Sequence, residues 1–364
     1  MPVQPLPAIF GIEPYKGGES SLAGFEKPIK LASNENPLGQ SLRVRDALLE
    51  AWRTLERYPD GHAIALKAAI GQRYGIDPAR IVCGAGSDEI FQLLARGYLA
   101  PGDEIVQSQY AFLVYRLVAQ QSGAVVRTAA DTAFTADVDA MLALVGPKTK
   151  IVFLANPNNP TGTYLPYAEV KRLHAALPET VLLVLDGAYA EYVDRNDYAS
   201  GIELAGAFDN VLMTRTFSKI HGLAALRLGW AFGPQGVIDT LNRVRGPFNI
   251  NSLALSAGIA AIQDVAFADE SARFNSAERD RLCDALEEMG LRFTPSVANF
   301  VLAHFPQSAG RTALDMDRHL RSRGLIVRMV GSYGLPDALR LSIGTRADND
   351  ALIAAMRAFP GLSA

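Results

Sequence analysis

Lys219 is the residue whose position in this chain most directly indicates chemistry. It lies shortly after the apolar run at residues 211–214, which has the composition of a buried strand. An ammonium group is costly to bury, so a lysine in this place favours a special use. One such use is a Schiff base with a carbonyl cofactor, which a lowered pKa promotes. A lysine whose stem extends to solvent is the alternative.

Two further polar residues follow the two preceding apolar runs. Asp186 directly follows residues 181–185, and Asn159 lies in the proline- and asparagine-rich stretch 156–162 behind residues 151–154. Pyridoxal phosphate (PLP) needs a carboxylate beside its protonated ring nitrogen, because the pyridinium ring is its electron sink. Asp186 can supply that carboxylate, and Asn159 can donate to the phenolic oxygen of the ring. A helix-cap aspartate and an ordinary turn are the alternatives.

The segment 84–89, Gly-Ala-Gly-Ser-Asp-Glu, joins an expected strand at 81–83 to an expected helix at 88–99. Backbone N–H groups at the start of a helix bind phosphate, and small residues allow a close approach. The segment is not a dinucleotide fingerprint, because Glu89 stands where the third glycine is needed, and no P-loop lysine follows. It is therefore a candidate phosphate loop, with a plain tight turn as the alternative. Arg227 is a candidate second phosphate anchor.

Two arginines stand in apolar, strand-like stretches near the end of the chain. Arg340 lies within residues 339–343, and Arg328 lies within residues 326–329. A guanidinium group among apolar strand residues is badly placed unless it meets an anion, and its shape suits a carboxylate or a phosphate. These arginines are therefore candidate substrate anchors, and arginines on an edge strand are the alternative.

The elements expected around these residues predict an α/β fold with a mostly parallel central sheet. The apolar runs are short and do not alternate with polar residues, which is typical of parallel strands covered by helices on both faces. Ligands bind beyond the carboxyl ends of such strands. After Asn251, a long helical region at 253–288 and later strand-like pieces indicate a smaller α+β domain. The expected divisions are 1–40 for an N-terminal arm joining the small domain, 41–252 for the large domain and 253–364 for the small domain.

Composition and charge argue against several other classes of protein. The 364 residues carry a net charge of -3 and a pI near 6.0, so no basic surface for nucleic acid or membrane is expected. Cys83 and Cys283 are too few for a disulfide framework and fit a reducing compartment. The start of the chain lacks a signal-peptide pattern, and no apolar run approaches the roughly 20 residues of a membrane span, so a cytoplasmic protein is expected. The five histidines are scattered, which predicts no metal site.

The order of the candidate residues along the chain resembles fold-type I PLP enzymes, and specifically the histidinol-phosphate aminotransferases. The resemblance covers nearly the whole chain. It includes Ser-Asn-Glu-Asn-Pro at 33–37, Arg-Tyr-Pro-Asp at 57–60 and the stretch 218–230, which begins Ser-Lys-Ile-His-Gly. It implies PLP as the cofactor, bound by a large domain that carries a smaller α+β domain.

The resemblance assigns roles to residues around the cofactor. Lys219 is implied to hold the cofactor and later to move a proton between the substrate carbon and the cofactor. Asp186 is implied to pair with the pyridine nitrogen, Asn159 and Tyr189 to hold the phenolic oxygen, and Tyr110 to stack on the ring. The residues implied to hold the cofactor phosphate are Ala85, Gly86, Ser87, Thr216, Ser218 and Arg227. Tyr58 is implied to reach the phosphate bound by a neighbouring subunit, which predicts a homodimer with a shared active site.

The resemblance also implies a substrate pocket. Arg340 is expected to bind the carboxylate of glutamate. Arg328, Tyr15 and Tyr58 are expected around the distal phosphate of histidinol phosphate. The residues implied to bind substrate are Tyr15, Asn36, Tyr58, Arg328 and Arg340. The arm departs from the family in one place, because Gly17 and Gly18 stand where the family often has Pro-Gly. A more flexible arm is therefore expected.

The implied reaction has two halves. Glutamate leaves its amino group on the cofactor and departs as 2-oxoglutarate, and the aminated cofactor then converts imidazole acetol phosphate to histidinol phosphate in histidine biosynthesis. One alternative is an aromatic aminotransferase acting on phenylalanine or tyrosine. A second is a threonine-phosphate decarboxylase, which releases carbon dioxide and needs no 2-oxoglutarate. A third, a binding or regulatory module without catalysis, is disfavoured because Lys219, Asp186 and Asn159 are all present.

Overall fold

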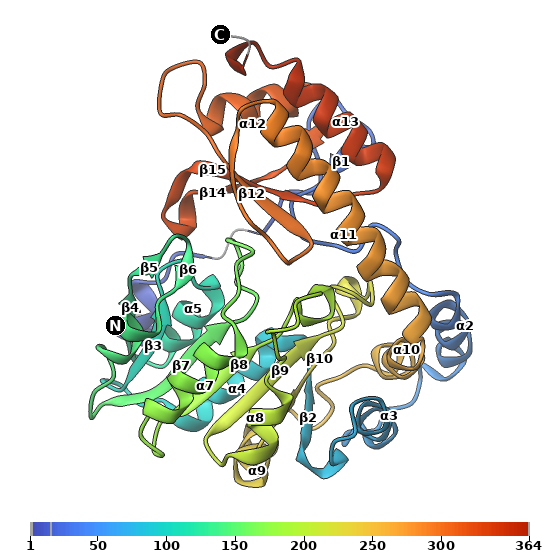
Figure 1. Ribbon diagram of the computed structural model, residues 1–364. Helices are drawn as coiled ribbons and strands as arrows, with labels where there is room; N and C mark the ends of the chain where they lie inside the picture. Colours follow the sequence, from blue (N-terminus) through green and yellow to red (C-terminus); the bar gives the residue numbers. More distant parts are fainter. Residues whose placement is uncertain (1–2, 15–16, 363–364) are drawn as a thin grey trace.

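A seven-stranded sheet forms the centre of the larger part of the molecule (Figure 1). The structure, a computed structural model, describes residues 3–14 and 17–362. The strand order is β2-β10-β9-β8-β7-β3-β4, and all neighbours are parallel except the pairs that β10 forms. The predicted α/β class with a mostly parallel sheet is confirmed. The strands are β2 (Ile81–Gly84), β3 (Glu104–Ser108), β4 (Val125–Ala129), β7 (Thr149–Ala155), β8 (Leu182–Asp186), β9 (Val211–Thr216) and β10 (Gly229–Phe232).

Helices cover both faces of this sheet, which explains why its strands are continuously apolar. In β7, Val152 and Leu154 face one hydrophobic cluster, while Ile151 and Phe153 face another. The first cluster includes residues of α2 (Leu42–Ala51), α3 (Ile64–Tyr74), α6 (Val138–Leu142), α7 (Tyr167–Ala176) and α8 (Ile202–Ala207). The second includes residues of α4 (Ser87–Tyr98), α5 (Leu113–Gln121) and α9 (Gln235–Val244).

The smaller part of the molecule is an antiparallel sheet with helices packed on it (Figure 1). Its strand order is β11-β12-β15-β14. Its core is a separate hydrophobic cluster, to which each of the three helices named below contributes residues. The elements are β11 (Arg292–Thr294), β12 (Phe300–His304), β14 (Arg328–Val330), β15 (Leu335–Ser342), α11 (Val265–Glu288), α12 (Ala313–Arg321) and α13 (Arg346–Arg357).

The helical region expected as one piece at 253–288 is two helices, α10 (Ser252–Gln263) and α11, with a bend of 76° between them. Asp264 marks the break, and its side chain accepts the N–H of Phe267 as the cap of α11. The buried residues of α10 belong to the core of the large sheet, together with those of α2 and α3. The hydrophobic cores therefore divide after α10 and not at residue 253, because α10 packs on the large domain. Within the described residues, no single helix is long and apolar enough to cross a membrane, and only this bent pair passes that test of length and composition.

The N-terminal arm contacts both parts of the molecule. Its strand β1 (Ile29–Lys30) pairs in parallel with β13 (Leu325–Ile326), and Leu31 is buried in the core of the small domain. The short helix α1 (Pro7–Phe10) instead lies against α5 of the large domain. The two remaining short strands, β5 (Asp131–Thr132) and β6 (Thr135–Ala136), pair with each other.

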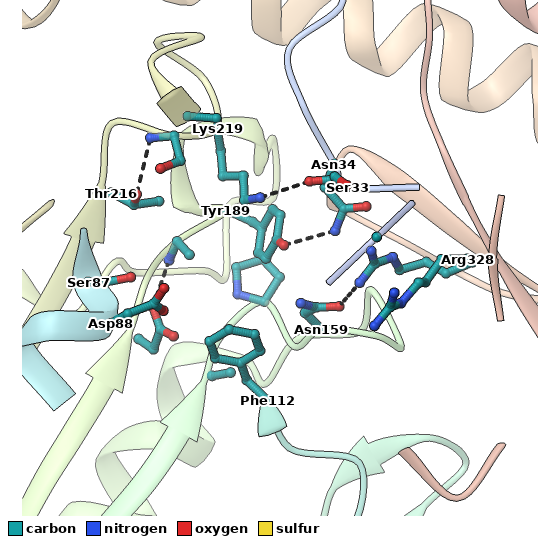
Figure 2. A pocket seen from close by; sticks show the side chains of 18 of the residues that line it. Ser33, Asn34, Ser87, Asp88, Phe112, Asn159, Tyr189, Thr216, Lys219 and Arg328 are labelled. Carbon is teal, nitrogen blue, oxygen red and sulfur yellow. Dashed lines mark hydrogen bonds between the residues drawn. The ribbon is translucent and has the colours of Figure 1, made fainter. Parts of the chain in front are cut away.

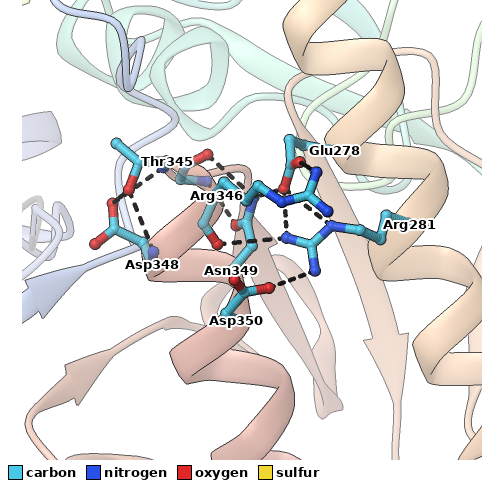
Figure 3. A network of polar contacts seen from close by, with 8 residues as sticks. Glu278, Arg281, Thr345, Arg346, Asp348, Asn349 and Asp350 are labelled. Atoms are coloured by element: carbon cyan, nitrogen blue, oxygen red, sulfur yellow. Dashed lines mark hydrogen bonds and ion pairs between the residues drawn. The ribbon is translucent and has the colours of Figure 1, made fainter.

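A buried carboxylate ties α11 to the turn between β15 and α13 (Figure 3). Glu278 accepts hydrogen bonds from Arg281 Nη2 at 2.6 Å and from Asn349 Nδ2 at 2.9 Å. Asn349 also bonds to the N–H and the C=O of Gly344, just beyond the end of β15. Each buried group left unpaired in such a network costs about 1–3 kcal/mol. The network therefore holds the end of β15 against α11.

Candidate active site

The carboxyl ends of β7, β8 and β9 open into a cavity of about 210 Å³ (Figure 2). Residues of the arm and of β14 and β15 complete its wall, so both domains contribute. The cavity lies where open α/β sheets bind their ligands. It brings together the predicted residues Ser87, Asn159, Asp186, Tyr189, Thr216, Ser218, Lys219, Arg227, Arg328 and Arg340.

The side chain of Lys219 extends into this cavity and not toward the outer surface (Figure 2). Its Nζ donates to the carbonyl oxygen of Ser33 at 3.1 Å. Burial, together with the positive charge of Arg340, lowers the pKa of Lys219 to about 8. An appreciable fraction of the amine is therefore neutral near neutral pH, as a nucleophilic amine must be.

Asp186 ends β8 as a buried carboxylate with three donors around it. Tyr115 donates to Oδ2 at 2.6 Å, while Thr214 Oγ1 and the N–H of Ala188 donate to Oδ1 at 3.3 and 3.1 Å. Burial raises the pKa of Asp186 to about 6, although these hydrogen bonds oppose the shift. Sequence reasoning missed Tyr115, whose position on the buried face of α5 is the only signal that could have pointed to it.

Two donors in the cavity wall are oriented by hydrogen bonds from neighbouring residues. Asn159 Oδ1 accepts from Arg340 Nη1 at 2.5 Å, which leaves the amide Nδ2 as the donor. The hydroxyl oxygen of Tyr189 accepts from Asn34 Nδ2 at 2.9 Å. Asn159 can therefore donate through Nδ2, and Tyr189 through its O–H, to an oxygen atom in the cavity.

The start of α4 and the loop after β9 form an end of the cavity that is rich in donors. Arg227 Nη1 donates to Ser218 Oγ at 3.4 Å, and Nη2 donates to Asp88 at 3.2 Å. Thr216 Oγ1 accepts the N–H of Ser218 at 3.1 Å. Ser87 and Asp88 stand in the first turn of α4 and line the cavity. A helix start, hydroxyl groups and a guanidinium group together suit a phosphate.

Ala85 and Gly86, also predicted in the phosphate loop, do not line the cavity. The N–H of Ala85 donates to the carboxylate of Glu89 at 2.5 Å, so that donor is already used within the loop. Gly86 has a φ of 79°, and a Cβ there would lie 2.5 Å from Arg227 Nη2. Glycine at this position thus allows Arg227 to approach, which is a supporting role. Of the predicted phosphate loop, the residues that line the cavity begin at Ser87, the first residue of α4.

Tyr110, predicted to stack on the cofactor ring, lies outside the wall of the cavity. Its ring lies 5.8 Å from that of Phe134 instead. Its carbonyl oxygen accepts from Asn158 Nδ2 at 3.0 Å. Phe112, two residues later, lines the cavity (Figure 2). Both residues are aromatic, so residue type could not distinguish them.

Asn36 is likewise outside the cavity, and Asn34 of the same motif takes its place. Asn36 Nδ2 donates to the carbonyl oxygen of Ile220 at 2.8 Å and to Ser271 Oγ at 3.0 Å. These bonds anchor the arm and leave no contact with the cavity. Asn34 lines the cavity and contacts Tyr189 (Figure 2).

Tyr58 and Tyr15 are not part of the cavity in this chain. Tyr58 is 83% exposed, and its ring stacks on Phe248 at a centroid distance of 4.7 Å. The exposed position leaves the predicted contact with a neighbouring subunit as a prediction. Tyr15 lies outside the residues that the structure describes.

Arg340 and Arg328 are direct partners across the β14–β15 pair, and both line the cavity. Like charges that face each other across two strands are unfavourable, so an anion between them is stabilising. Arg340 is buried, and its Nη2 donates to the carbonyl oxygen of Ala32 at 2.8 Å. Arg328 Nη1 donates to the carbonyl oxygen of Gly17 at 2.6 Å, which brings the arm to the cavity rim.

The chain is similar to known proteins in both sequence and structure. The model of the family "Aminotransferase class I and II" matches residues 26–356. The histidinol-phosphate aminotransferase of Maricaulis maris is 54% identical over 359 residues, 99% of each chain. That of Rhodopseudomonas palustris is 52% identical over 356 residues, 98% of each chain. The crystal structure of histidinol-phosphate aminotransferase from Sinorhizobium meliloti in complex with pyridoxal-5'-phosphate has a TM-score of 0.87 and 28% identity, covering 98% of this chain and 96% of that one.

The lowered pKa of Lys219 gives a direct prediction for the cofactor-free protein. Acylation of its amine should follow pH with a midpoint near 8, because the amine is neutral above its pKa. Arg340→Gln removes a nearby positive charge and should move the midpoint upward, toward the ordinary value of 10.5. Arg318→Gln, on the exposed side of α12, is the matched control and should leave it unchanged. Peptide mass spectrometry measures the acylation, and a midpoint near 10.5 in the unsubstituted protein contradicts the account.

Proposed function

Because this chain belongs to the aminotransferase class I and II family, we propose that it transfers an amino group between glutamate and histidinol phosphate with PLP as cofactor. Glutamate becomes 2-oxoglutarate, and imidazole acetol phosphate becomes histidinol phosphate, in histidine biosynthesis. The observation that carries the proposal is the single cavity that holds Lys219, Asp186 and Arg340. Relatives more than 50% identical along nearly the whole chain bear the name of this activity.

The residues of the cavity fit PLP at each of its polar groups. When bound, PLP supplies an electron-withdrawing ring that takes up the electrons of a substrate C–H bond. Asp186, held by Tyr115, is proposed to accept a hydrogen bond from the protonated ring nitrogen. Asn159 Nδ2 and the Tyr189 hydroxyl are the donors for the phenolic oxygen, and Phe112 covers a face of the ring. The groups proposed to hold the phosphate are the side chains of Ser87, Thr216, Ser218 and Arg227 and the backbone N–H groups at the start of α4.

Lys219 serves both to hold the cofactor and to move a proton. Its Nζ, with a pKa lowered to about 8, can attack the cofactor aldehyde while unprotonated. With a substrate amine on the cofactor, the Lys219 amine would be free to act as a base in the same cavity. It could then take a proton from the substrate α-carbon. The positive charge of Arg340 keeps Nζ partly unprotonated, which favours this task.

Arg340 and Arg328 are proposed to bind the anionic groups of the two substrates. Arg340 is buried and fixed by Asn159 and by the carbonyl oxygen of Ala32, so it offers a guanidinium group in one orientation. Its Nε is a buried donor with no hydrogen-bond partner among the described residues. A carboxylate in one half-reaction and a phosphate in the other can occupy the same place. Arg328, across the strand pair, adds a second charge on the phosphate side.

The half-reaction of the PLP-loaded protein tests this proposal. We predict that histidinol phosphate removes the visible absorbance of the bound cofactor in a single turnover, far faster than phenylalanine, tyrosine or threonine phosphate at equal concentration. Lys219→Ala should abolish both the absorbance band and the turnover, because no amine remains to join the cofactor. Stopped-flow absorbance measures each rate. Equal or faster conversion by phenylalanine or tyrosine would make the protein an aromatic aminotransferase, and release of carbon dioxide from threonine phosphate would make it a decarboxylase.

We further propose that the protein acts as a homodimer, in the cytoplasm and without nucleic-acid or membrane partners. Large apolar side chains are exposed on α2, on the segment that follows it, at the start of α3 and at Phe248, which stacks on Tyr58. These residues are Leu42, Leu49, Trp52, Leu55, Tyr58, Ile64 and Phe248. A patch of this kind marks an interaction surface. A second copy of the chain is the proposed occupant, because Tyr58 lies in the patch and outside the cavity of its own chain.

Two defective variants should restore activity when they are mixed, if Tyr58 serves the neighbouring site. In a dimer of Lys219→Ala with Tyr58→Ala, one site contains an intact Lys219 and an intact Tyr58 from its partner. Random pairing of equal amounts should recover about a quarter of the unsubstituted activity beyond that of the separate variants. Lys219→Ala mixed with Asp186→Ala is the control and should recover nothing, because each site then lacks one residue. Failure of the first mixture to regain activity after exchange of subunits contradicts the shared site.

A further inference from the structure

We infer that Asn34 is a positioning residue that sets the direction of the Tyr189 hydroxyl and so makes the arm part of the cofactor site. This inference rests on the proposed function and adds to it a residue that acts on the cofactor through Tyr189. Asn34 lies in the arm between β1 and α2, yet its side chain reaches the cavity wall (Figure 2).

Two residues of the small domain, Ser342 and Asn299, hold the backbone of Asn34 in an uncommon conformation. Its φ is 55°, in the left-handed region that asparagine tolerates better than most residues. Its N–H donates to Ser342 Oγ at 2.9 Å, and its carbonyl oxygen accepts from Asn299 Nδ2 at 2.9 Å. Asn34 is 1% exposed. A residue so fully bonded and buried has a fixed side-chain position.

The orientation of the Asn34 amide sets the direction of its hydrogen bonds to Ser342 and Tyr189. Ser342 Oγ accepts from the N–H of Asn34, and its own proton goes to Asn34 Oδ1 at 2.8 Å. Because Oδ1 is the acceptor, the Nδ2 group faces Tyr189 and donates to its oxygen at 2.9 Å. The hydroxyl of Tyr189 has one proton, which must then point away from Asn34. Tyr189 lines the cavity, so its hydroxyl proton can be donated to a ligand oxygen there.

The same arrangement links the cofactor side of the cavity to its substrate side. Ser342 and Arg340 are two residues apart in β15, and their side chains therefore lie on the same face of the strand. Asn34 joins that strand to Tyr189 of the large domain. The donor role of Tyr189 thus depends on the arm being packed between the two domains.

Asn36 provides a comparison for Asn34, because it anchors the arm without lining the cavity. It is also a buried arm asparagine, and its amide donates to Ile220 and Ser271. It is not among the residues that line the cavity. The two asparagines therefore separate a directional role from an anchoring role, and the same substitution at each provides a matched pair.

The experiment is a pH titration of the visible absorbance of PLP bound to Lys219. Asn34→Asp is nearly isosteric but replaces the donor by an acceptor, so the Tyr189 proton turns toward it and away from the phenolic oxygen. A phenolic oxygen that loses a donor becomes more basic, and the titration midpoint should rise by about one to two pH units. Tyr189→Phe should raise it similarly. Asn36→Asp should leave it within about 0.3 units of the unsubstituted protein, an interval well below one lost hydrogen bond.

The double variant distinguishes positioning from a direct charge effect. If Asn34 acts through Tyr189, adding Asn34→Asp to Tyr189→Phe should shift the midpoint no further. An equal shift in both backgrounds means that the new carboxylate acts by its charge alone, and this outcome overturns the inference. No shift in the Tyr189-containing background also overturns it.

A second variant keeps the test valid if Asn34→Asp does not fold. Ser342→Ala removes the hydroxyl that fixes the amide orientation, and it should raise the midpoint in the same direction by a smaller amount, again only when Tyr189 is present. An unchanged midpoint in this variant contradicts the inference. If the unsubstituted protein has an absorbance band that titrates but these variants do not shift it, the role of Asn34 is refuted and the proposed cofactor is not. If no such band is present, the proposed cofactor itself is refuted.

Discussion

The buried carboxylate of Asp186 is the constraint on which the rest of the site depends. A carboxylate removed from water needs donors, and three surround it, of which Tyr115 is the closest at 2.6 Å. Burial nevertheless keeps its pKa raised to about 6, so a cationic partner in the cavity stabilises the charged form further. A protonated ring nitrogen is such a partner. The remaining residues can then be understood by their position around that ring.

The positive charges of the cavity are arranged at its two ends. Arg227 stands with the start of α4 at one end, while Arg340 and Arg328 face each other across β14 and β15 at the other. Lys219 lies between them, and the field of Arg340 helps to lower its pKa. A ligand with a phosphate at one end and a substrate anion at the other therefore neutralises both. The arm contacts the cavity wall through Asn34, which bonds to Tyr189, and through the carbonyl oxygen of Gly17, which accepts from Arg328.

The sequence predicted the parts of the site that follow from strand ends. Lys219, Asp186 and Asn159 meet because each follows a continuously apolar strand of one parallel sheet. It did not predict which of two similar residues faces the cavity, as with Phe112 in place of Tyr110, because that depends on how a loop enters a helix. The division of α10 from α11 was missed for a related reason, since a bend at one aspartate leaves helical periodicity intact on both sides.

The state of the cofactor ring nitrogen tests the central role of Asp186 most directly. PLP labelled with ¹⁵N at that nitrogen can be bound to the protein and observed by NMR. The account predicts the chemical shift of a protonated nitrogen up to about pH 8 in the unsubstituted protein, because the adjacent carboxylate stabilises the cation. Asp186→Asn should give the shift of an unprotonated nitrogen under the same conditions, with Asp88→Asn as a control that retains the protonated signal. The same unprotonated shift in the unsubstituted protein and in Asp186→Asn would contradict the account.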